Sequence, residues 1–188
     1  MASNIIQYFD YGTNMNPEKM SLCQIPFSER RPAKLENYEF VMNHRRMNGT
    51  AGVNIRYNKD STVYGILYTC TYESIERLDR YMGSTYSRQL INVIPRKCSD
   101  PNTPILVQDY VDEPVSAHIY IGLENSASND ISNTVIDISK EYLEHVLCGR
   151  DMLPKEYVDF LTTFQQHTVT VCPGEEYFLI DAANETEE

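Results

Sequence analysis

The sequence predicts an α+β protein built on a small, antiparallel-rich β-barrel, closed or nearly closed, with flanking helices. Strand-like segments follow one another in the first half of the chain without regular alternation with helices, and the clearest amphipathic helices come late. The length of 188 residues fits one domain, which we place at residues 1–183, followed by an acidic tail at 184–188.

The N-terminal segment predicts a strand that enters a tight loop. Residues 5–11 form an apolar run that breaks at Gly12-Thr13-Asn14. Asn16 and Pro17 then begin a short helix, as its N-cap and its first residue. The loop lacks the glycine spacing of a P-loop or a dinucleotide fingerprint, so it indicates a binding loop without naming a nucleotide.

The middle of the chain predicts further strands and one helix. Strands are expected at 38–42, 51–57, 62–71, 87–94 and 115–121, and a helix at 72–82 with Gly83 as its stop. Gly65 interrupts a strand pattern, which indicates a bulge or a close approach of another backbone. Residues 95–104 and 124–133 are polar and are expected to form loops.

The last third predicts two helices that bury one face each. Ser139 caps the first, with Gly149 as its stop, and Pro154 starts the second. A final hairpin is expected between residues 169–171 and 177–180.

The composition excludes several classes of function. With 27 acidic and 16 basic side chains the formal charge is -11, which argues against nucleic acid or an anionic membrane as a partner. No apolar run approaches the roughly 20 residues of a membrane span, and the start of the chain has no signal-peptide pattern, so we expect a cytoplasmic protein. We expect no metal site, because the four histidines are scattered.

The five cysteines never form a CxxC pair, which predicts reduced thiols and neither a disulfide framework nor a zinc site. Cys70 lies in an apolar strand pattern and Cys148 on a helical pattern. We expect both to be packing residues.

Three ordered motifs resemble those of the γ-glutamylcyclotransferase-like family. The segment YFDYGTNM at residues 8–15 resembles the family's YFAYGSN signature, VYGILY at 63–68 resembles its V-x-G-x-L/V-Y strand, and LDRYMG at 78–83 resembles its LDxYEG helix end. The later segment from 142 to 164, with LPKEY at 153–157, resembles the family's helix, G, LP-x-EY, helix segment. The similarity spans roughly residues 5–165.

The resemblance implies a small barrel whose loop cradles a γ-glutamyl substrate. In the family reaction the substrate's own α-amine attacks its γ-carbonyl, forms 5-oxoproline and expels an amine, without a cofactor. On this basis the expected substrate-binding residues are Tyr11, Gly12, Thr13, Asn14, Met82 and Arg45. The partner is expected to be a small molecule.

The sequence departs from the family at the residue that moves the proton. The carboxylate of LDxYEG removes a proton from the attacking amine and returns one to the leaving amine, and Met82 stands at that position. A thioether transfers no proton, and a general acid–base group contributes roughly 10²–10⁴ in rate. Without the resemblance, Met82 is simply an apolar residue of the helix face that carries Ile75 and Leu78.

Asp10 and Tyr86 are the candidate catalytic residues that remain. Asp10 stands where the family has alanine, so it is a candidate for a relocated acid or base; the alternative is a carboxylate that accepts hydrogen bonds from the adjacent turn amides. Tyr86 matches a family tyrosine that lies beside the catalytic glutamate, so it is a candidate for a hydrogen bond to a ligand or, secondarily, for an acid; the alternative is a structural tyrosine. The basic pair Arg45 and Arg46 suits a substrate carboxylate or is a solvated turn.

Three functions follow from these observations. The first is a cyclase- or lyase-type enzyme descended from this family, with chemistry altered by Met82. The second is a non-catalytic member that binds a metabolite or a protein. The third is an ordinary γ-glutamylcyclotransferase that uses another carboxylate, such as Asp79 or Glu76.

Overall fold

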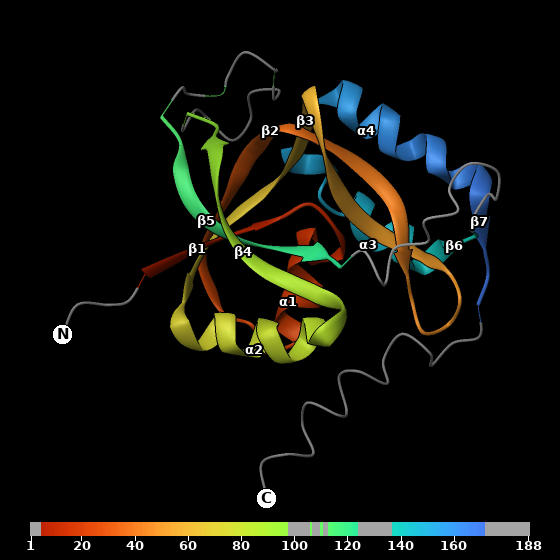
Figure 1. Ribbon diagram of the computed structural model, residues 1–188, viewed down its shortest axis with the longest axis horizontal. Helices are drawn as coiled ribbons and strands as arrows, with labels where there is room; N and C mark the ends of the chain where they lie inside the picture. The colour runs from red at the N-terminus through yellow and green to blue at the C-terminus, as the bar shows by residue number, and fades with distance from the viewer. Residues whose placement is uncertain (1–4, 98–105, 107–109, 111–112, 124–136, 172–188) are drawn as a thin grey trace, which may run out of the picture.

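The fold is given by a computed structural model that describes residues 5–97, 106, 110, 113–123 and 137–171. Five strands close into a barrel of mixed strand direction: β1 (Ile5–Asp10), β2 (Phe27–Arg45), β3 (Ala51–Thr71), β4 (Tyr86–Pro95) and β5 (Val115–Gly122). Their order is β1-β5-β4-β2-β3, and β1 also pairs with β3, so the ring is closed (Figure 1). The pairing is antiparallel except between β1 and β5, which confirms the antiparallel-rich barrel predicted from the sequence.

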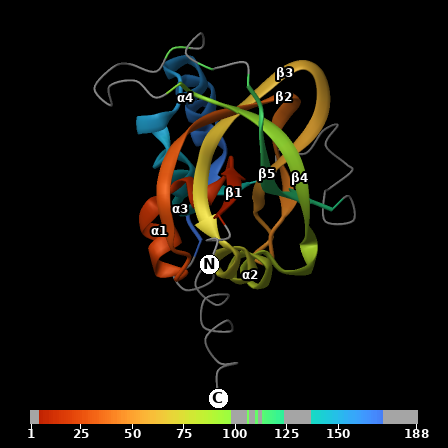
Figure 2. The same cartoon turned by 90° about the vertical axis from the view of Figure 1, so that its left-hand side faces the viewer.

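Helices and two short strands flank the barrel. The helices are α1 (Pro17–Leu22), α2 (Tyr72–Met82), α3 (Lys140–Leu147) and α4 (Lys155–Thr162), and β6 (Ile138–Ser139) and β7 (Thr168–Val169) extend the sheet beyond β3. The turn η1 (Thr13–Met15) joins β1 to α1, and η2 (Gly83–Thr85) joins α2 to β4. Figures 1 and 2 show α2 beneath the strands and α3 and α4 together on another side. No helix of the described residues is long and apolar enough to span a membrane.

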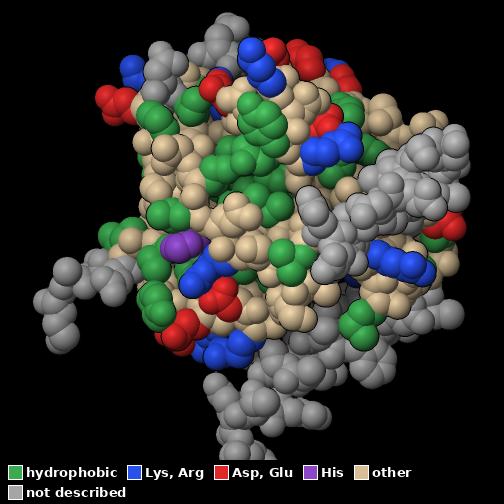
Figure 3. Space-filling view, in the orientation of Figure 1, with side chains coloured by type: hydrophobic (Ala, Val, Ile, Leu, Met, Phe, Trp, Pro, Cys, Tyr) green, Lys and Arg blue, Asp and Glu red, His purple; other side chains and the backbone are tan. Residues whose placement is uncertain are grey.

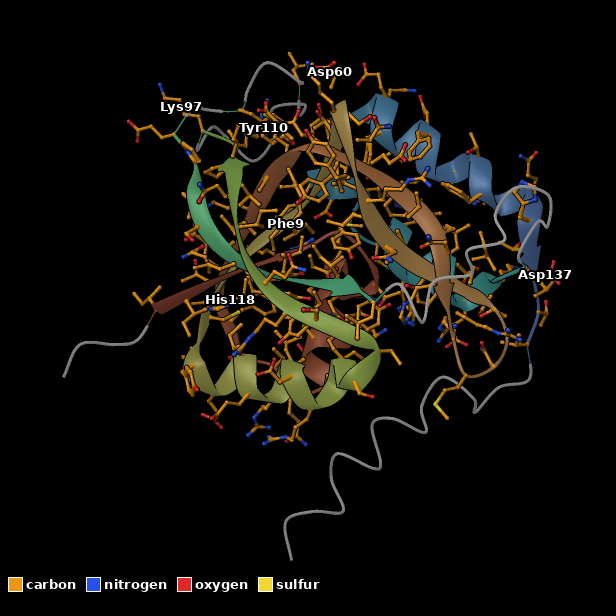
Figure 4. All side chains as sticks on the ribbon, viewed as in Figure 1. Phe9, Asp60, Lys97, Tyr110, His118 and Asp137 are labelled. Atoms are coloured by element: carbon orange, nitrogen blue, oxygen red, sulfur yellow. The ribbon has the colours of Figure 1, made fainter. Side chains whose placement is uncertain are left out.

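The hydrophobic core fills the barrel. Phe9 points into its centre and is fully buried, as are Leu67 and Ile119 from β3 and β5 (Figure 4). Hydrophobic side chains also gather over the strands near the upper centre of the face shown in Figure 3.

Strands β2 and β3 are much longer than the sequence predicted, at 19 and 21 residues. The strands predicted at 51–57 and 62–71 form one strand, but their pairing with β2 is interrupted at the predicted break. Glu36 pairs with Thr62 and Tyr38 with Tyr57, so residues 58–61 have no partner in the ladder. Residues 56–60 are exposed, so nothing in their polarity marks them as strand.

The helix ends largely follow their sequence signals. The Asn16 side chain accepts from the Glu18 N–H at 2.9 Å, Ser139 caps α3 through the Tyr142 N–H at 3.3 Å, and Gly83 ends α2 at a φ of 64°. Gly149 is different, because its φ of -78° is not left-handed. A Cβ at Gly149 would meet the Met15 side chain at 2.9 Å, so close packing explains this glycine.

One expectation about the cysteines is wrong, and four predicted segments lie wholly or partly outside the described residues. Cys70 is buried as expected, but Cys148 is exposed at the end of α3, so it is not a packing residue. The loop at 124–133, most of the loop at 95–104, the distal half of the expected hairpin and the acidic tail lie outside the described residues.

Candidate functional site

One end of the barrel gathers most of the segments that the sequence analysis singled out. Here β1 ends at Asp10, and β5 ends beside the beginning of β4, since Tyr86 pairs with Gly122. In Figure 1 the arrowhead of β5 points to the side on which α2 leads into β4. We call this end the mouth and define it as residues 10–16, 43–46 and 51–54 together with Tyr86, Gly122 and Tyr142.

The loop after β1 is held in a fixed shape. The Tyr68 hydroxyl donates to the Asn14 carbonyl oxygen at 2.7 Å, and Lys19 Nζ donates to Thr13 Oγ1 at 2.7 Å. Gly12 is required by packing, because a Cβ there would lie 2.6 Å from Val53 Cγ2. The backbone of the loop therefore lies directly against the beginning of β3.

Asp10 is the only acidic side chain among the described residues that is buried, with an exposed fraction of 8%. Its Oδ1 accepts from the Tyr8 hydroxyl at 2.7 Å, and its Oδ2 accepts from the Gly12 N–H at 2.9 Å. Burial raises the pKa of Asp10, against the opposing effect of these two donors and of the Lys19 charge. The carboxyl group is thus hydrogen-bonded to the loop, and its pKa is raised toward the pH range in which general acids and bases act.

Tyrosine hydroxyls meet the backbone at Val53. The Val53 N–H donates to Tyr142 Oη at 2.8 Å, and the Tyr86 hydroxyl approaches the Val53 carbonyl oxygen at 3.5 Å. Burial raises the pKa of Tyr86 well above its usual value, and the neighbouring Tyr142 and Tyr11 add to this effect. Tyr86 therefore keeps its proton and is suited to donating a hydrogen bond.

His44 lies at the mouth although no sequence signal selected it. Its ring packs on Tyr86 with centroids 4.1 Å apart, and only 3% of the residue is exposed. Burial lowers the pKa of His44, and the charge of Arg46 lowers it further, so the ring is neutral near pH 7. Beside it, Asn54 Oδ1 accepts from the Gly122 N–H at 2.9 Å and fixes the end of β5.

Of the basic pair, Arg46 and not Arg45 contacts the buried part of the mouth. The Arg46 guanidinium lies 4.5 Å from the centroid of the Tyr142 ring, whereas Arg45 is exposed at the end of β2. The alternation of side chains along a strand separates the two neighbours, and the sequence alone does not say which one faces inward.

The end of α2 carries no buried carboxylate. Met82 is half-buried and packs against the hydrophobic core, and the chain reaches Tyr86 after the η2 turn. Asp79 Oδ1 accepts from the Tyr120 hydroxyl at 2.7 Å, and its Oδ2 pairs with Arg88 at 2.8 Å. Glu76 is exposed on α2. Both carboxylates that the sequence analysis offered as substitutes are therefore occupied or solvated.

The structure thus brings together Asp10, the loop from Tyr11 to Asn14, and Tyr86. Sequence analysis missed His44, Asn54 and Tyr142 as mouth residues, since a histidine beside arginines and a tyrosine on a helix face carry no spacing signal. They lie at the mouth because the beginning of β3 passes through it: Val53 contacts Tyr142 and the Gly12 position, and Asn54 contacts Gly122. Within the described part of the chain, no group of three or more His, Cys, Asp or Glu side chains is arranged to hold a metal ion.

A surface groove of about 510 Å³ lies elsewhere, between α1 and α2. Its one charged lining residue, Arg77, is engaged by Gln24 and Glu73 at 2.9 Å each. The groove shares no residue with the mouth, so its size does not bear on the site described above.

Solved structures similar to this chain share its fold. An uncharacterized protein, loc79017, from Homo sapiens aligns with a TM-score of 0.69 and 16% identity, over 94% of this chain and 98% of that one. A structure described as a gamma-glutamyl cyclotransferase aligns with a TM-score of 0.67 and 15% identity, over 96% and 99%. A yeast gamma-glutamyl cyclotransferase specific to glutathione aligns with a TM-score of 0.62 and 13% identity, over 88% and 97%.

A comparison with curated protein sequences finds no match. The family model described as "Gamma-glutamyl cyclotransferase, AIG2-like" matches residues 8–135, which is more than half of the chain and includes the loop, Asp10, the end of α2 and Tyr86. The chain belongs to the gamma-glutamyl cyclotransferase, AIG2-like family.

Proposed function

We propose that this protein is a cofactor-independent enzyme of the cyclase or lyase type that acts on a small γ-glutamyl-like molecule at the mouth, and that Asp10, rather than the residue at position 82, transfers the proton. The observation that carries this proposal is the carboxyl group of Asp10, which is buried, bonded to the Gly12 N–H and raised in pKa. Family membership and the gamma-glutamyl cyclotransferases among the similar structures support the reaction type.

The chemistry needs one group that takes and returns a proton. The substrate amine gives a proton to the Asp10 carboxylate, and its lone pair forms a bond to the carbonyl carbon. The bond from that carbon to the leaving nitrogen breaks with its electron pair on nitrogen, and Asp10 returns the proton there. A pKa raised by burial makes a carboxylate a better base in the first step while it remains an acid for the second.

Tyr86 is proposed as a hydrogen-bond donor to the substrate, because its raised pKa keeps it protonated. The loop residues Tyr11, Gly12, Thr13 and Asn14 are proposed to hold the reacting group. We propose that Met82 lines the approach to the mouth as an apolar contact, in the place where the family has its glutamate.

A non-catalytic role in binding a metabolite is the second candidate. It is favoured by one observation, that both oxygens of Asp10 already accept hydrogen bonds from within the chain. A carboxylate oxygen has more than one lone pair, so these bonds do not by themselves remove Asp10 from proton transfer.

The experiment is turnover of a panel of γ-glutamyl amino acids and amines, followed by mass spectrometry for 5-oxoproline and for loss of substrate. Asp10→Asn keeps the shape of the side chain and is expected to lower turnover by about 10²–10⁴-fold. Asp60→Asn is the matched control: Asp60 is exposed, and its φ of 67° is one that Asn also adopts, so no change in turnover is expected.

Met82→Glu then restores a carboxylate at the family position. In the Asp10→Asn background this second change is expected to recover 5-oxoproline release. Conversion by the wild type that is insensitive to Asp10→Asn overturns the assignment of Asp10. Retention of a panel compound without conversion supports the binding role instead.

A further inference from the structure

A hydrogen-bonded chain of three buried side chains links Asp10 to the loop. Asn14 Nδ2 donates to Tyr8 Oη at 3.0 Å, and the Tyr8 hydroxyl donates to Asp10 Oδ1 at 2.7 Å. The exposed fractions are 2% for Asn14, 1% for Tyr8 and 8% for Asp10. Asn14 Oδ1 is also buried, and no donor among the described residues reaches it.

The direction of each bond in this chain follows from the charge of Asp10. An ionised carboxylate only accepts hydrogen bonds, so the single hydroxyl proton of Tyr8 must point to Asp10. Tyr8 Oη must then accept from its other neighbour, which requires Asn14 to turn its NH₂ group toward it. The Asn14 carbonyl oxygen is thereby left as an acceptor without a donor.

A proton on Asp10 reverses every one of these bonds. Oδ2 is held by the Gly12 N–H, so the proton goes to Oδ1, which then donates to Tyr8. The Tyr8 hydroxyl is released to donate to Asn14, and the Asn14 amide must rotate by about half a turn to present its oxygen. Its NH₂ group then replaces the oxygen as the free end of the chain.

We infer that Tyr8 and Asn14 are positioning residues that couple the proton on Asp10 to the orientation of the Asn14 amide in the loop. With Asp10 ionised, the group of Asn14 without a partner is an acceptor; with Asp10 protonated, it is a donor. The catalytic value of this coupling rests on the proposed function, but the coupling itself exists without substrate.

Among the titratable side chains of this network, Asp10 is the one that changes charge near neutral or acidic pH. The tyrosines that face it keep their protons, because burial raises their pKa, and the Lys19 Nζ that lies nearby donates to Thr13. These neighbours are Tyr8 and Tyr11 beside it, Lys19 from α1, Tyr68 from β3, Tyr86 from β4 and Tyr142 from α3, together with Tyr120 from β5, whose ring lies 5.9 Å from that of Tyr8.

The test is a pH titration followed by NMR on the substrate-free protein. The ¹³Cγ signal of Asp10, identified by its absence in Asp10→Asn, and the side-chain ¹⁵N signal of Asn14, identified by its absence in Asn14→Ala, are expected to move with the same midpoint. Asp10→Asn imitates the protonated state, so in that variant the Asn14 signal is expected to stay at its low-pH position at every pH.

Tyr8→Phe removes the link and Tyr68→Phe is its matched control. The rings of Tyr8 and Tyr68 stack 6.1 Å apart, both are fully buried, and each variant loses one hydroxyl. In Tyr8→Phe the Asn14 signal is expected to stop following Asp10, and the Asp10 midpoint to shift upward because its carboxylate has lost a donor. In Tyr68→Phe both signals are expected to keep moving together.

Separate midpoints in the wild type, or coupling that survives Tyr8→Phe, would overturn the inference. Neither result depends on turnover, so a failure of the coupling is distinguishable from a failure of Asp10 as the proton carrier. Where the panel yields a substrate, the acid limb of the pH–rate profile is expected to shift upward in Tyr8→Phe and not in Tyr68→Phe.

Discussion

Gly65 lies where the antiparallel pairing of β1 with β3 ends, next to Ile66, which pairs with Asp10, and Gly65→Ala tests how tightly this contact fixes Asp10. A Cβ at Gly65 would lie 2.2 Å from the Asp10 carbonyl oxygen and 2.8 Å from Phe9 Cζ. Ordinary contacts begin near 3.4 Å, so the β1 backbone must move by about 1 Å. Phe9 is fully buried, which leaves its ring no free space to move into.

The cost exceeds the usual gain from replacing glycine. Loss of unfolded-state entropy favours alanine by about 0.4–1 kcal/mol. Overpacking a core costs typically about 1–3 kcal/mol, and we expect at least the upper value because the obstacle is backbone. The net loss is then at least about 2 kcal/mol. In a chain of 188 residues each kcal/mol lowers Tm by roughly 2–4 °C, so Tm is expected to fall by at least about 4–8 °C.

Thermal unfolding followed by circular dichroism and urea titration measure the effect. Gly149→Ala is the comparison variant: the Cβ added there would lie 2.9 Å from Met15 Cβ, a less severe contact than 2.2 Å from a backbone oxygen, so we expect a smaller loss than in Gly65→Ala. A Gly65→Ala protein that melts within a degree of the wild type would refute the close contact between Gly65 and the Asp10 carbonyl oxygen.

Three further perturbations test the mouth and its supports. Tyr142→Phe leaves the buried Val53 N–H without its acceptor, so the free energy of unfolding in urea is expected to fall by about 1–3 kcal/mol. Asn16→Ala removes the cap that accepts from Glu18 N–H, and the same measurement should show a loss of about 1 kcal/mol, whereas no loss would mean that α1 does not need its cap. Burial raises the pKa of Asp10 in the folded state. The protonated carboxyl therefore stabilises the fold below its unfolded pKa of about 4, and this stabilisation is lost as the pH rises through the folded pKa. The stability of Asp10→Asn relative to the wild type should therefore increase from pH 4 to pH 7 in urea titrations, and a constant difference would show that the folded pKa is not raised.

The candidate site was predictable only where it lies in one short segment. The loop and Asp10 are adjacent in the sequence, so the motif at residues 8–15 indicated them together. The sequence does not show whether Arg45 or Arg46 faces inward. Arg45 is the residue expected from the sequence to bind substrate, whereas the structure brings Arg46 to Tyr142. His44 carries no motif at all.

The local signals of the chain determined the barrel class, the ends of its helices and the position of the binding loop. Caps, glycine stops and apolar periodicity act within a few residues, and Asn16, Ser139 and Gly83 therefore have the same role in the sequence and in the fold. Only the tertiary structure decided that the beginning of β3 folds back against Gly12 and that Asp10 is buried beneath the loop. The contact between Gly12 and Val53 joins residues far apart in the sequence. Burial of Asp10 depends on such long-range packing, which no local pattern of residues encodes.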